Sequence, residues 1–195
     1  MIKSSIINHD TMTEGTEEVG VLTTYCTFWL GNGLFAAEAS LVKEVAVVPF
    51  VTPIPQAPGA VCGYVNLRGH IVFVLDMNYL FYRSSTQIGN DTRLVVFRSH
   101  LGDPFGILVD RIDGIVELSD DLIEKFPQGL FSSDGENRTP PEVEVITGIG
   151  KLDDELFSIL DAHKLLSNID KAIARRRANS LHREQLLSSE ERVLL

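Results

Sequence analysis

The chain has 195 residues with 17 basic and 27 acidic side chains, a formal net charge of −10, and 44% hydrophobic residues. This length suits one domain, or two small halves that share a core, and the apolar fraction excludes a chain that is disordered throughout. The negative balance argues against a body that binds nucleic acid, because contact with phosphates needs Lys and Arg.

Residues 1–20 predict a flexible acidic arm. They are rich in Thr and Glu and contain no long apolar stretch, so they do not resemble a secretory signal peptide. Apolar runs elsewhere, such as 45–51, are far shorter than the roughly 18 residues typical of a membrane-spanning helix, and no direct membrane insertion is expected. Cys26 and Cys62 stand in apolar surroundings without CxxC spacing, which favours buried thiols in a reducing cytosol.

Short apolar stretches rich in Val, Ile and Phe, broken by Gly, Pro and Asn-Gly, predict β structure over most of 22–160. Strands are expected at 24–30, 41–51, 70–75, 93–98, 105–109, 114–118 and 156–160. Asn32-Gly33 predicts a type I′ hairpin turn, and Leu101-Gly102-Asp103 is a second candidate turn. Many short strands with turns at this spacing favour small barrels or a sandwich.

The chain also matches itself in two places. At an offset of 70 residues, 34–47 matches 104–117, and each segment has the pattern strand, short gap, strand. At an offset of 85 residues, 63–80 matches 148–165, and each segment has an apolar strand followed by an Asp that opens a helical turn. The change of offset predicts an insertion within 119–144. Two related β units in tandem are therefore expected.

The last stretch, 168–195, differs in charge and in period. It holds 6 basic and 4 acidic side chains, whereas the residues before it hold 11 basic and 23 acidic ones. Ser167–Asp170 offers a helix cap, and the following residues lack Gly and Pro, which predicts a basic helical tail. A solvated helical face is the favoured interpretation of Arg175-Arg176-Arg177.

Residues with catalytic or metal-binding chemistry are sparse. The five histidines are scattered without helical pairing, and no Gly-x-Ser-x-Gly motif occurs, so no metal site, cofactor or nucleophilic serine is expected. Asp76 and Asp161 occupy matching places in the repeat, as the two carboxylates of a double-barrel aspartic hydrolase do. Neither is followed by the small residue and Gly that such a site needs, and a helix-capping role is favoured instead. The sequence predicts that the protein is not an enzyme.

One charged segment stands between two apolar strands. Asn66-Leu67-Arg68-Gly69 places an Arg on a tight turn, where the side chain is either exposed or held by a carboxylate. Several further blocks accompany this segment at fixed distances, and together the series resembles the CheW-type coupling (adaptor) protein family of bacterial chemotaxis over about 22–167. The blocks are 28–35, 42–45, Pro55-x-x-Pro58, 63–71, 74–76, 106–112, 148–152 and 159–161.

The resemblance implies a CheW-like domain at 21–167, built of two tandem SH3-like five-stranded β-barrels followed by a C-terminal helix. The first barrel is expected at about 21–90 and the second at about 91–167. The implied function is that of a non-enzymatic scaffold, without cofactors, that couples chemoreceptors to the histidine kinase CheA in two-component signal transduction. The implied location is the cytoplasm, at membrane-associated receptor arrays.

The implied partners are the cytoplasmic tip of methyl-accepting chemotaxis proteins, the regulatory domain of CheA, and further CheW-like domains. The segment 123–130 falls near the second barrel's contact with a neighbouring ring member. Two alternatives remain open. One is a CheW-like adaptor of a non-flagellar chemosensory system, and the other is the aspartic hydrolase that would use Asp76 and Asp161.

The resemblance also implies a set of binding residues. Glu44 and Arg68 match the family's acid and arginine that pair to shape the receptor-binding surface. Val42, Gly63 and Ile115 fall where apolar or small residues face the receptor groove between the barrels. The predicted receptor- and kinase-binding residues are Val42, Glu44, Gly63, Asn66, Arg68 and Ile115.

Overall fold

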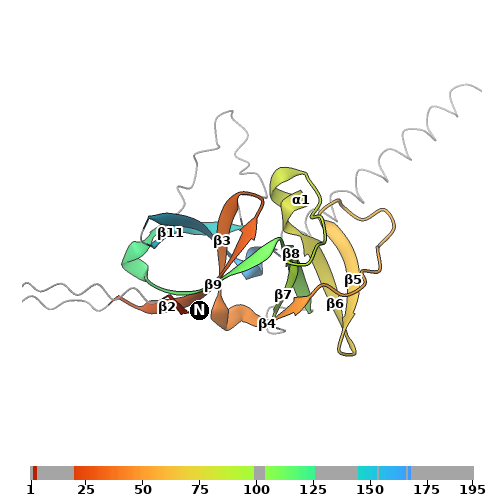
Figure 1. Ribbon diagram of the computed structural model, residues 1–195, viewed down its shortest axis with the longest axis horizontal. Coiled ribbons are helices and arrows are strands. Elements are labelled where there is room, and N and C mark those ends of the chain that lie inside the picture. The colour runs from red at the N-terminus through yellow and green to blue at the C-terminus, as the bar shows by residue number, and fades with distance from the viewer. Residues whose placement is uncertain are drawn as a thin grey trace, which may run out of the picture.

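The computed structural model describes residues 2–3, 20–98, 104–125, 145–152, 154–165 and 167. These residues form two β-sheets that lie side by side, with one helix above their junction (Figure 1). The prediction of a mainly β chain is confirmed.

The first sheet has seven strands in the order β1-β9-β2-β3-β12-β11-β10. Its strands are β1 (Ile2–Lys3), β2 (Leu22–Leu30), β3 (Gly33–Glu38), β9 (Arg111–Ser119), β10 (Ile123–Lys125), β11 (Ile146–Leu152) and β12 (Glu155–Leu160). The second sheet has five strands in the order β4-β7-β8-β6-β5. Its strands are β4 (Val42–Val47), β5 (Val61–Leu67), β6 (His70–Asp76), β7 (Arg93–Phe97) and β8 (Phe105–Val109).

Short helices connect some of these strands. The helix α1 (Met77–Tyr82) follows β6, and the 3-10 turns η1 (Ala39–Leu41) and η3 (Asp120–Leu122) precede β4 and β10. A further helical turn over 162–165 follows β12. Both α-helical turns therefore come directly after the strands that the internal repeat relates, as the sequence predicts.

The two halves of the repeat exchange their first hairpins. The hairpin β2–β3 belongs to the seven-stranded sheet, where β3 runs parallel to β12 and Phe35 pairs with Ser158. The hairpin β7–β8 belongs to the five-stranded sheet, where β8 runs parallel to β6 and Phe105 pairs with Phe73. These two pairs are related by the same offsets of 70 and 85 residues as the sequence repeat. The duplication is therefore visible in the strand register.

The exchange corrects the expected boundary near residue 90. The five-stranded sheet takes its strands from 42–109, whereas the seven-stranded sheet takes its strands from both sides of that segment. The chain crosses between the sheets after β3 and again after β8. The sequence pattern of strand, short gap and strand contains no information about which sheet each strand joins, so the crossing could not be read from it.

Three clusters of buried apolar side chains form the core. The largest joins the two sheets and takes Phe28 from β2 and Phe97 from β7. A second cluster lies within the seven-stranded sheet, and a third lies within the five-stranded sheet around Val72. On β7, Val95 belongs to the shared cluster and Leu94 to the third cluster. This strand is buried on both faces, which explains its continuous apolar run.

Some local expectations change. The hairpin after β2 is confirmed, but Leu30 pairs with Gly33, so its turn residues are Gly31 and Asn32. Positive φ occurs at Gly31 alone of these two residues, as in a type II′ turn, not the expected type I′. Within the predicted arm, Ile2–Lys3 pairs with β9 in parallel. The expected turn at 101–103, most of the insertion in 119–144 and the helical tail at 168–195 lie outside the described residues.

Candidate functional site

The matching aspartates both act as helix caps. The Asp76 carboxylate accepts hydrogen bonds from the Tyr79 N–H, at 3.1 Å, and from the backbone and hydroxyl of Thr86, at 2.8 and 2.7 Å. The Asp161 carboxylate accepts from the N–H groups of the next helical turn, at 2.9 and 3.2 Å. Each carboxylate is occupied by donors of its own neighbourhood, at the end of a strand in a different sheet. This arrangement does not favour the aspartic hydrolase.

The turn between β5 and β6 is built by three neighbouring residues. Leu67 pairs with His70, so the turn residues are Arg68 and Gly69, with φ of 53° and 88°. Two positive φ values are what a type I′ turn requires, and the right-handed twist of a hairpin favours that turn. The Asn66 side-chain oxygen accepts a hydrogen bond from the Gly69 N–H at 2.8 Å. Asn66 therefore fixes the turn that presents Arg68.

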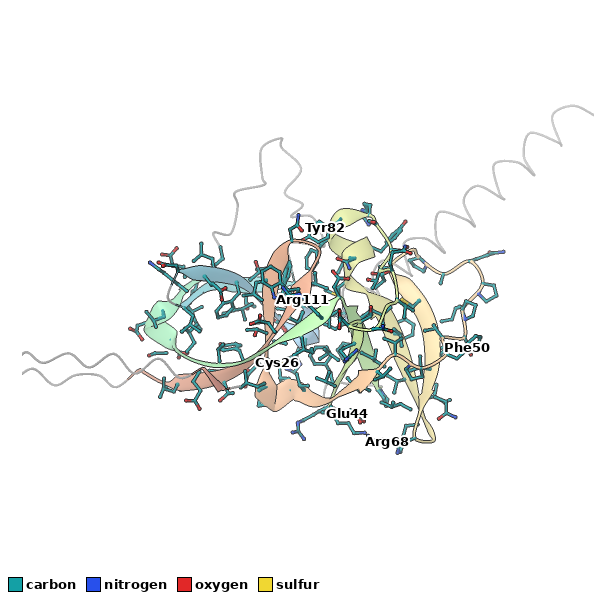
Figure 2. The ribbon with its side chains drawn as sticks, in the orientation of Figure 1. Cys26, Glu44, Phe50, Arg68, Tyr82 and Arg111 are labelled. Atoms are coloured by element: carbon teal, nitrogen blue, oxygen red, sulfur yellow. The ribbon has the colours of Figure 1, made fainter. Side chains whose placement is uncertain are left out.

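Arg68 forms an ion pair with Glu44. The guanidinium nitrogen lies 3.3 Å from the Glu44 carboxylate, and the two side chains are 81% and 22% exposed. Figure 2 shows the two residues close together at one end of the five-stranded sheet. The strands β4 and β5 are the two edges of this sheet. The ion pair therefore links one edge to the turn that leaves the other edge, and it is the Glu44–Arg68 contact that the family resemblance implies.

Gly63 has a backbone role beneath this surface. It is buried, has a φ of 140°, and stands at a register shift in β5. The chain at Thr52 crosses directly over it, held by two backbone hydrogen bonds with Tyr64 of 2.8 and 2.9 Å. A Cβ at this position would lie only 2.0 Å from the Thr52 carbonyl oxygen. Only glycine allows that crossing segment to lie so close.

The two remaining predicted residues lie on different sheets. Val42 begins β4, pairs with Phe97 and packs against the shared core, so it is half-buried. Ile115 lies in the middle of β9, where it is 37% exposed and pairs with Cys26. The structure thus brings Glu44, Asn66 and Arg68 to one end of the five-stranded sheet and leaves Ile115 on the seven-stranded sheet.

Exposed apolar side chains on the edge strand β4 and in the segment that follows it were missed by the sequence reasoning. Along β4 the half-buried and exposed positions alternate, and the exposed ones include Val45 and Val47, at 40% and 72%. Phe50 follows at 86% exposure. The alternation in 42–47 is the signal that would have found them, because period two separates the two faces of a strand. An apolar strip on an unpaired edge is typical of a protein–protein contact.

The described residues offer little for catalysis or for membrane insertion. Burial raises the pKa of Cys26, and burial together with the charge of Asp76 raises the pKa of Cys62 to about 12. Both thiols stay protonated near neutral pH, so neither is an activated nucleophile. Within the described ranges, no group of three His, Cys, Asp or Glu residues is placed to hold a metal ion. In the same ranges, no helix is long and apolar enough to cross a membrane.

A model of the CheW-like domain matches residues 24–170. The chain belongs to this family. Chemotaxis protein CheW of Treponema pallidum is 31% identical over 145 residues, which are 73% of this chain and 81% of that protein. Chemotaxis protein CheW of Helicobacter pylori is 28% identical over 153 residues, which are 78% of this chain and 85% of that protein.

The fold agrees with a solved member of the CheW-like family. The crystal structure of the scaffolding protein TtCheW from Thermoanaerobacter tengcongensis superposes with a TM-score of 0.61 at 26% identity. The match covers 73% of this chain and 91% of that chain. The predicted CheW-like fold of two β subdomains is confirmed, and the chain has an adaptor role in chemotaxis signalling.

Proposed function

We propose that this CheW-like chain is a non-enzymatic adaptor that couples the cytoplasmic tips of chemoreceptors to the regulatory domain of the histidine kinase CheA. It would work in the cytoplasm, at membrane-associated receptor arrays, where further CheW-like domains are additional partners. The observation that carries the proposal is the Glu44–Arg68 ion pair, which lies at a sheet edge that also carries exposed apolar side chains.

The proposed contact surface combines predicted and newly found residues. Glu44, Asn66 and Arg68 supply its polar part, and the strip along β4 and Phe50 supplies its apolar part. Val42 and Ile115 would add apolar contacts on the two sheets. Gly63 is buried, so its contribution would be to hold the crossing segment at Thr52 in place. Such a mixture of an apolar centre and a polar rim is typical of a reversible protein interface.

The shared core explains how such a surface could transmit a signal. Side chains from both sheets pack in one cluster, which holds the two sheets as one body. A body of this kind keeps two partners at a fixed spacing and orientation. An adaptor changes the activity of a kinase only if it binds one kinase state more tightly than the other. The proposed adaptor therefore acts through the way in which it holds the receptor and the kinase relative to each other.

The first test is the variant Arg68→Asn in co-sedimentation with receptor-containing membranes and CheA. Asn tolerates positive φ, so the turn is preserved while the charge is lost. We expect about a tenfold weaker association, since a hydrogen bond to a charged group contributes roughly 1.5–3 kcal/mol. Sedimentation equal to that of the wild type would contradict a binding role for Arg68.

A matched control is available on another turn. Arg83 also has positive φ, at 58°, and ends α1 away from the Glu44–Arg68 surface. Arg83→Asn makes the same chemical change on the same backbone conformation, so it should leave co-sedimentation unchanged. The alternative of a non-flagellar chemosensory system predicts the same surface. Capture of the tagged full chain from its own cells, followed by identification of the attached kinase, distinguishes the two systems.

A further inference from the structure

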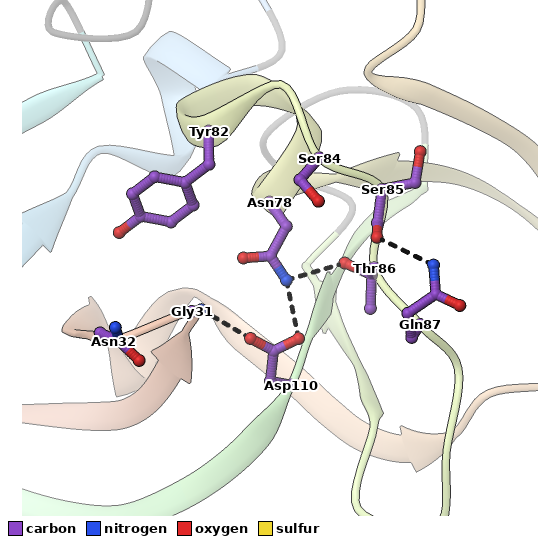
Figure 3. Close-up of a pocket in the computed structure, with 9 residues that line it drawn as sticks. All are labelled: Gly31, Asn32, Asn78, Tyr82, Ser84, Ser85, Thr86, Gln87 and Asp110. Carbon is purple, nitrogen blue, oxygen red and sulfur yellow. Dashed lines mark hydrogen bonds between the residues drawn. The ribbon is translucent and has the colours of Figure 1, made fainter.

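A polar pocket lies beside α1, at the opposite end of the molecule from the Glu44–Arg68 ion pair (Figure 2). It has a volume of about 430 Å³ and is formed by the β2–β3 turn, α1, the loop that follows α1, and Asp110 between β8 and β9. Figure 3 shows Tyr82 and Gly31 on one side of it, and Thr86 and Asp110 at its base. The pocket thus lies between the β2–β3 turn of the seven-stranded sheet and the helix that follows β6 of the five-stranded sheet.

Asn78 is the central residue of this pocket. It is 8% exposed, and its side-chain nitrogen donates to Asp110 at 2.7 Å and to Thr86 at 3.0 Å. A carboxylate only accepts hydrogen bonds, so the amide nitrogen has to face Asp110, and this fixes the orientation of the amide. The amide oxygen then points away from Asp110, and it has no hydrogen-bond partner. Figure 3 shows it directed into the space beside Tyr82.

An acceptor that is buried without a partner has a cost of roughly 1–3 kcal/mol. A water molecule could satisfy it, and the volume of about 430 Å³ also leaves room for a donor group larger than one water. The unpaired oxygen and the space in front of it together indicate a site for a ligand that donates a hydrogen bond.

The charges around the pocket define the ligand further. Asp110 accepts one bond from Asn78 and one from the Gly31 N–H, at 2.6 Å, which leaves lone pairs on both oxygens. Asp76 stands behind Thr86, which donates to it through both its hydroxyl and its N–H. Burial and the charge of Asp110 raise the pKa of Tyr82, so this phenol stays neutral. Of the described residues, those lining the pocket include no Lys, Arg or His.

We propose that this pocket binds a cationic nitrogen group that donates hydrogen bonds, a primary ammonium or a guanidinium. The Asn78 amide oxygen and the Asp110 carboxylate would accept its N–H bonds, and the Tyr82 ring would cover its apolar stem. The group is carried either by a free small amine or by a Lys or Arg side chain of a binding partner. This site goes beyond the adaptor function and does not depend on the Glu44–Arg68 surface.

The test uses the full chain labelled with nitrogen-15 and titrated with butylammonium chloride or butylguanidinium chloride. The Gly31 amide and the Asn78 side-chain amide both donate to Asp110, so their NMR signals report on the pocket directly. We expect saturable shifts of both signals. Tetramethylammonium chloride carries the same charge without an N–H donor, and it should produce no saturable shift. Equal shifts with both cations, or none with butylammonium and butylguanidinium, would overturn the proposal.

Two variants test whether the cation binds at Asp110 and Asn78. Asp110→Asn keeps the shape and removes the charge, and Asn78→Leu removes the free acceptor; each should weaken binding by about tenfold or more. Asp113→Asn is the matched control, because Asp113 stands three residues after Asp110 but accepts hydrogen bonds from Thr27 and Trp29 outside the pocket. If Asn78→Leu does not fold, the comparison of cation binding by Asp110→Asn and by Asp113→Asn still tests the proposal. Equal binding by these two aspartate variants would contradict the proposal.

A third comparison separates the two sources of the ligand. The end-blocked peptide Ala-Lys-Ala carries the same ammonium group as butylammonium, together with a peptide backbone. Binding of the peptide at least tenfold tighter than butylammonium would assign the pocket to a partner's side chain. Equal or weaker binding of the peptide would assign it to a free amine. If the pocket bound no cation, the expected result for Arg68→Asn in co-sedimentation would not change, so the two proposals can be disproved independently.

Discussion

The two helix starts of the repeat can be compared atom by atom. Asp76 is 4% exposed and accepts bonds from its own helix and from Thr86 in the following loop. Asp161 has a side chain that is 21% exposed, accepts only from its own turn, and forms an ion pair with Lys164 at 3.6 Å. The capping device is the same in both halves, and in the first half the loop after the helix also donates hydrogen bonds to the capping carboxylate.

This difference explains why the polar pocket occurs in the first half. The returning loop at Thr86 forms one wall of the pocket, and Asn78 lies beside it with one unpaired oxygen. The residue that matches Asn78 in the second half is His163, which is exposed. The strands therefore preserve the duplication, whereas Asn78 and His163 differ in chemistry and in exposure. The following predictions test where the two halves remain equivalent.

The largest expected effect concerns positions where the halves should remain equivalent. Phe28 on β2 pairs with Ile112, and Phe97 on β7 pairs with Val42. The numbers of these two partners differ by the repeat offset of 70, so the two phenylalanines are equivalent in register. They are 0% and 1% exposed and lie in the shared cluster. Removing a buried Phe side chain costs about 3–5 kcal/mol. We expect Phe28→Ala and Phe97→Ala to lower the free energy of unfolding by about 4 kcal/mol each, measured in urea. Losses that differ by more than about 2 kcal/mol would show that the cores are not equivalent.

The second prediction concerns the helix starts, where the halves should differ. Asp76→Ala leaves three donors without their acceptor in a buried site, and we expect a loss of about 3 kcal/mol in the free energy of unfolding. Asp161→Ala removes an exposed cap, with an expected loss of about 1 kcal/mol. Urea denaturation of both variants measures the difference. Equal losses would mean that the loop contact through Thr86 adds no stability.

Much of this fold could be predicted from local pattern. The strand at 105–109 has the predicted bounds, and both helical turns follow the aspartates that the repeat singled out. These features depend on turn chemistry, capping and apolar runs, which are properties of neighbouring residues. The Glu44–Arg68 contact was also expected, but from the family resemblance and not from local pattern.

The exchange of hairpins and the polar pocket could not be predicted in this way. Which sheet receives β7 and β8 depends on packing between segments far apart in the sequence. The pocket depends on Asp110, which lies 32 residues from Asn78. Neither residue has a spacing that marks it as part of a site. The free oxygen of Asn78 becomes apparent only when all the partners of its amide are known.

The third prediction is a pH dependence that arises from Cys62, whose thiol is influenced by the capping carboxylate of the first helix start. Burial, and then the charge of Asp76, raises the pKa of Cys62 to about 12, whereas an unfolded thiol titrates near ~8.5. Below about pH 8.5 the thiol is protonated in both the folded and the unfolded state, so it makes no pH-dependent contribution to the free energy of unfolding. As the pH rises from about 8.5 toward 12, only the unfolded state loses its proton, so the protein becomes less stable. Urea midpoints between pH 7 and 10 should fall more in the wild type than in Cys62→Ala, and parallel curves would contradict the raised pKa.

The smallest expected effect on stability is that of the Glu44–Arg68 ion pair, which also has no counterpart in the second half. The residue that matches Glu44 in β9 is Gly114, so the same pairing cannot form there. Since Arg68 is 81% exposed, solvent screens the pair, and a double-mutant cycle of Glu44→Gln and Arg68→Asn should give a coupling below about 0.5 kcal/mol in unfolding. A coupling above about 2 kcal/mol would make the pair a structural element. Weaker co-sedimentation of Arg68→Asn would then reflect a disturbed turn, whereas a small coupling assigns that loss to the partner contact itself.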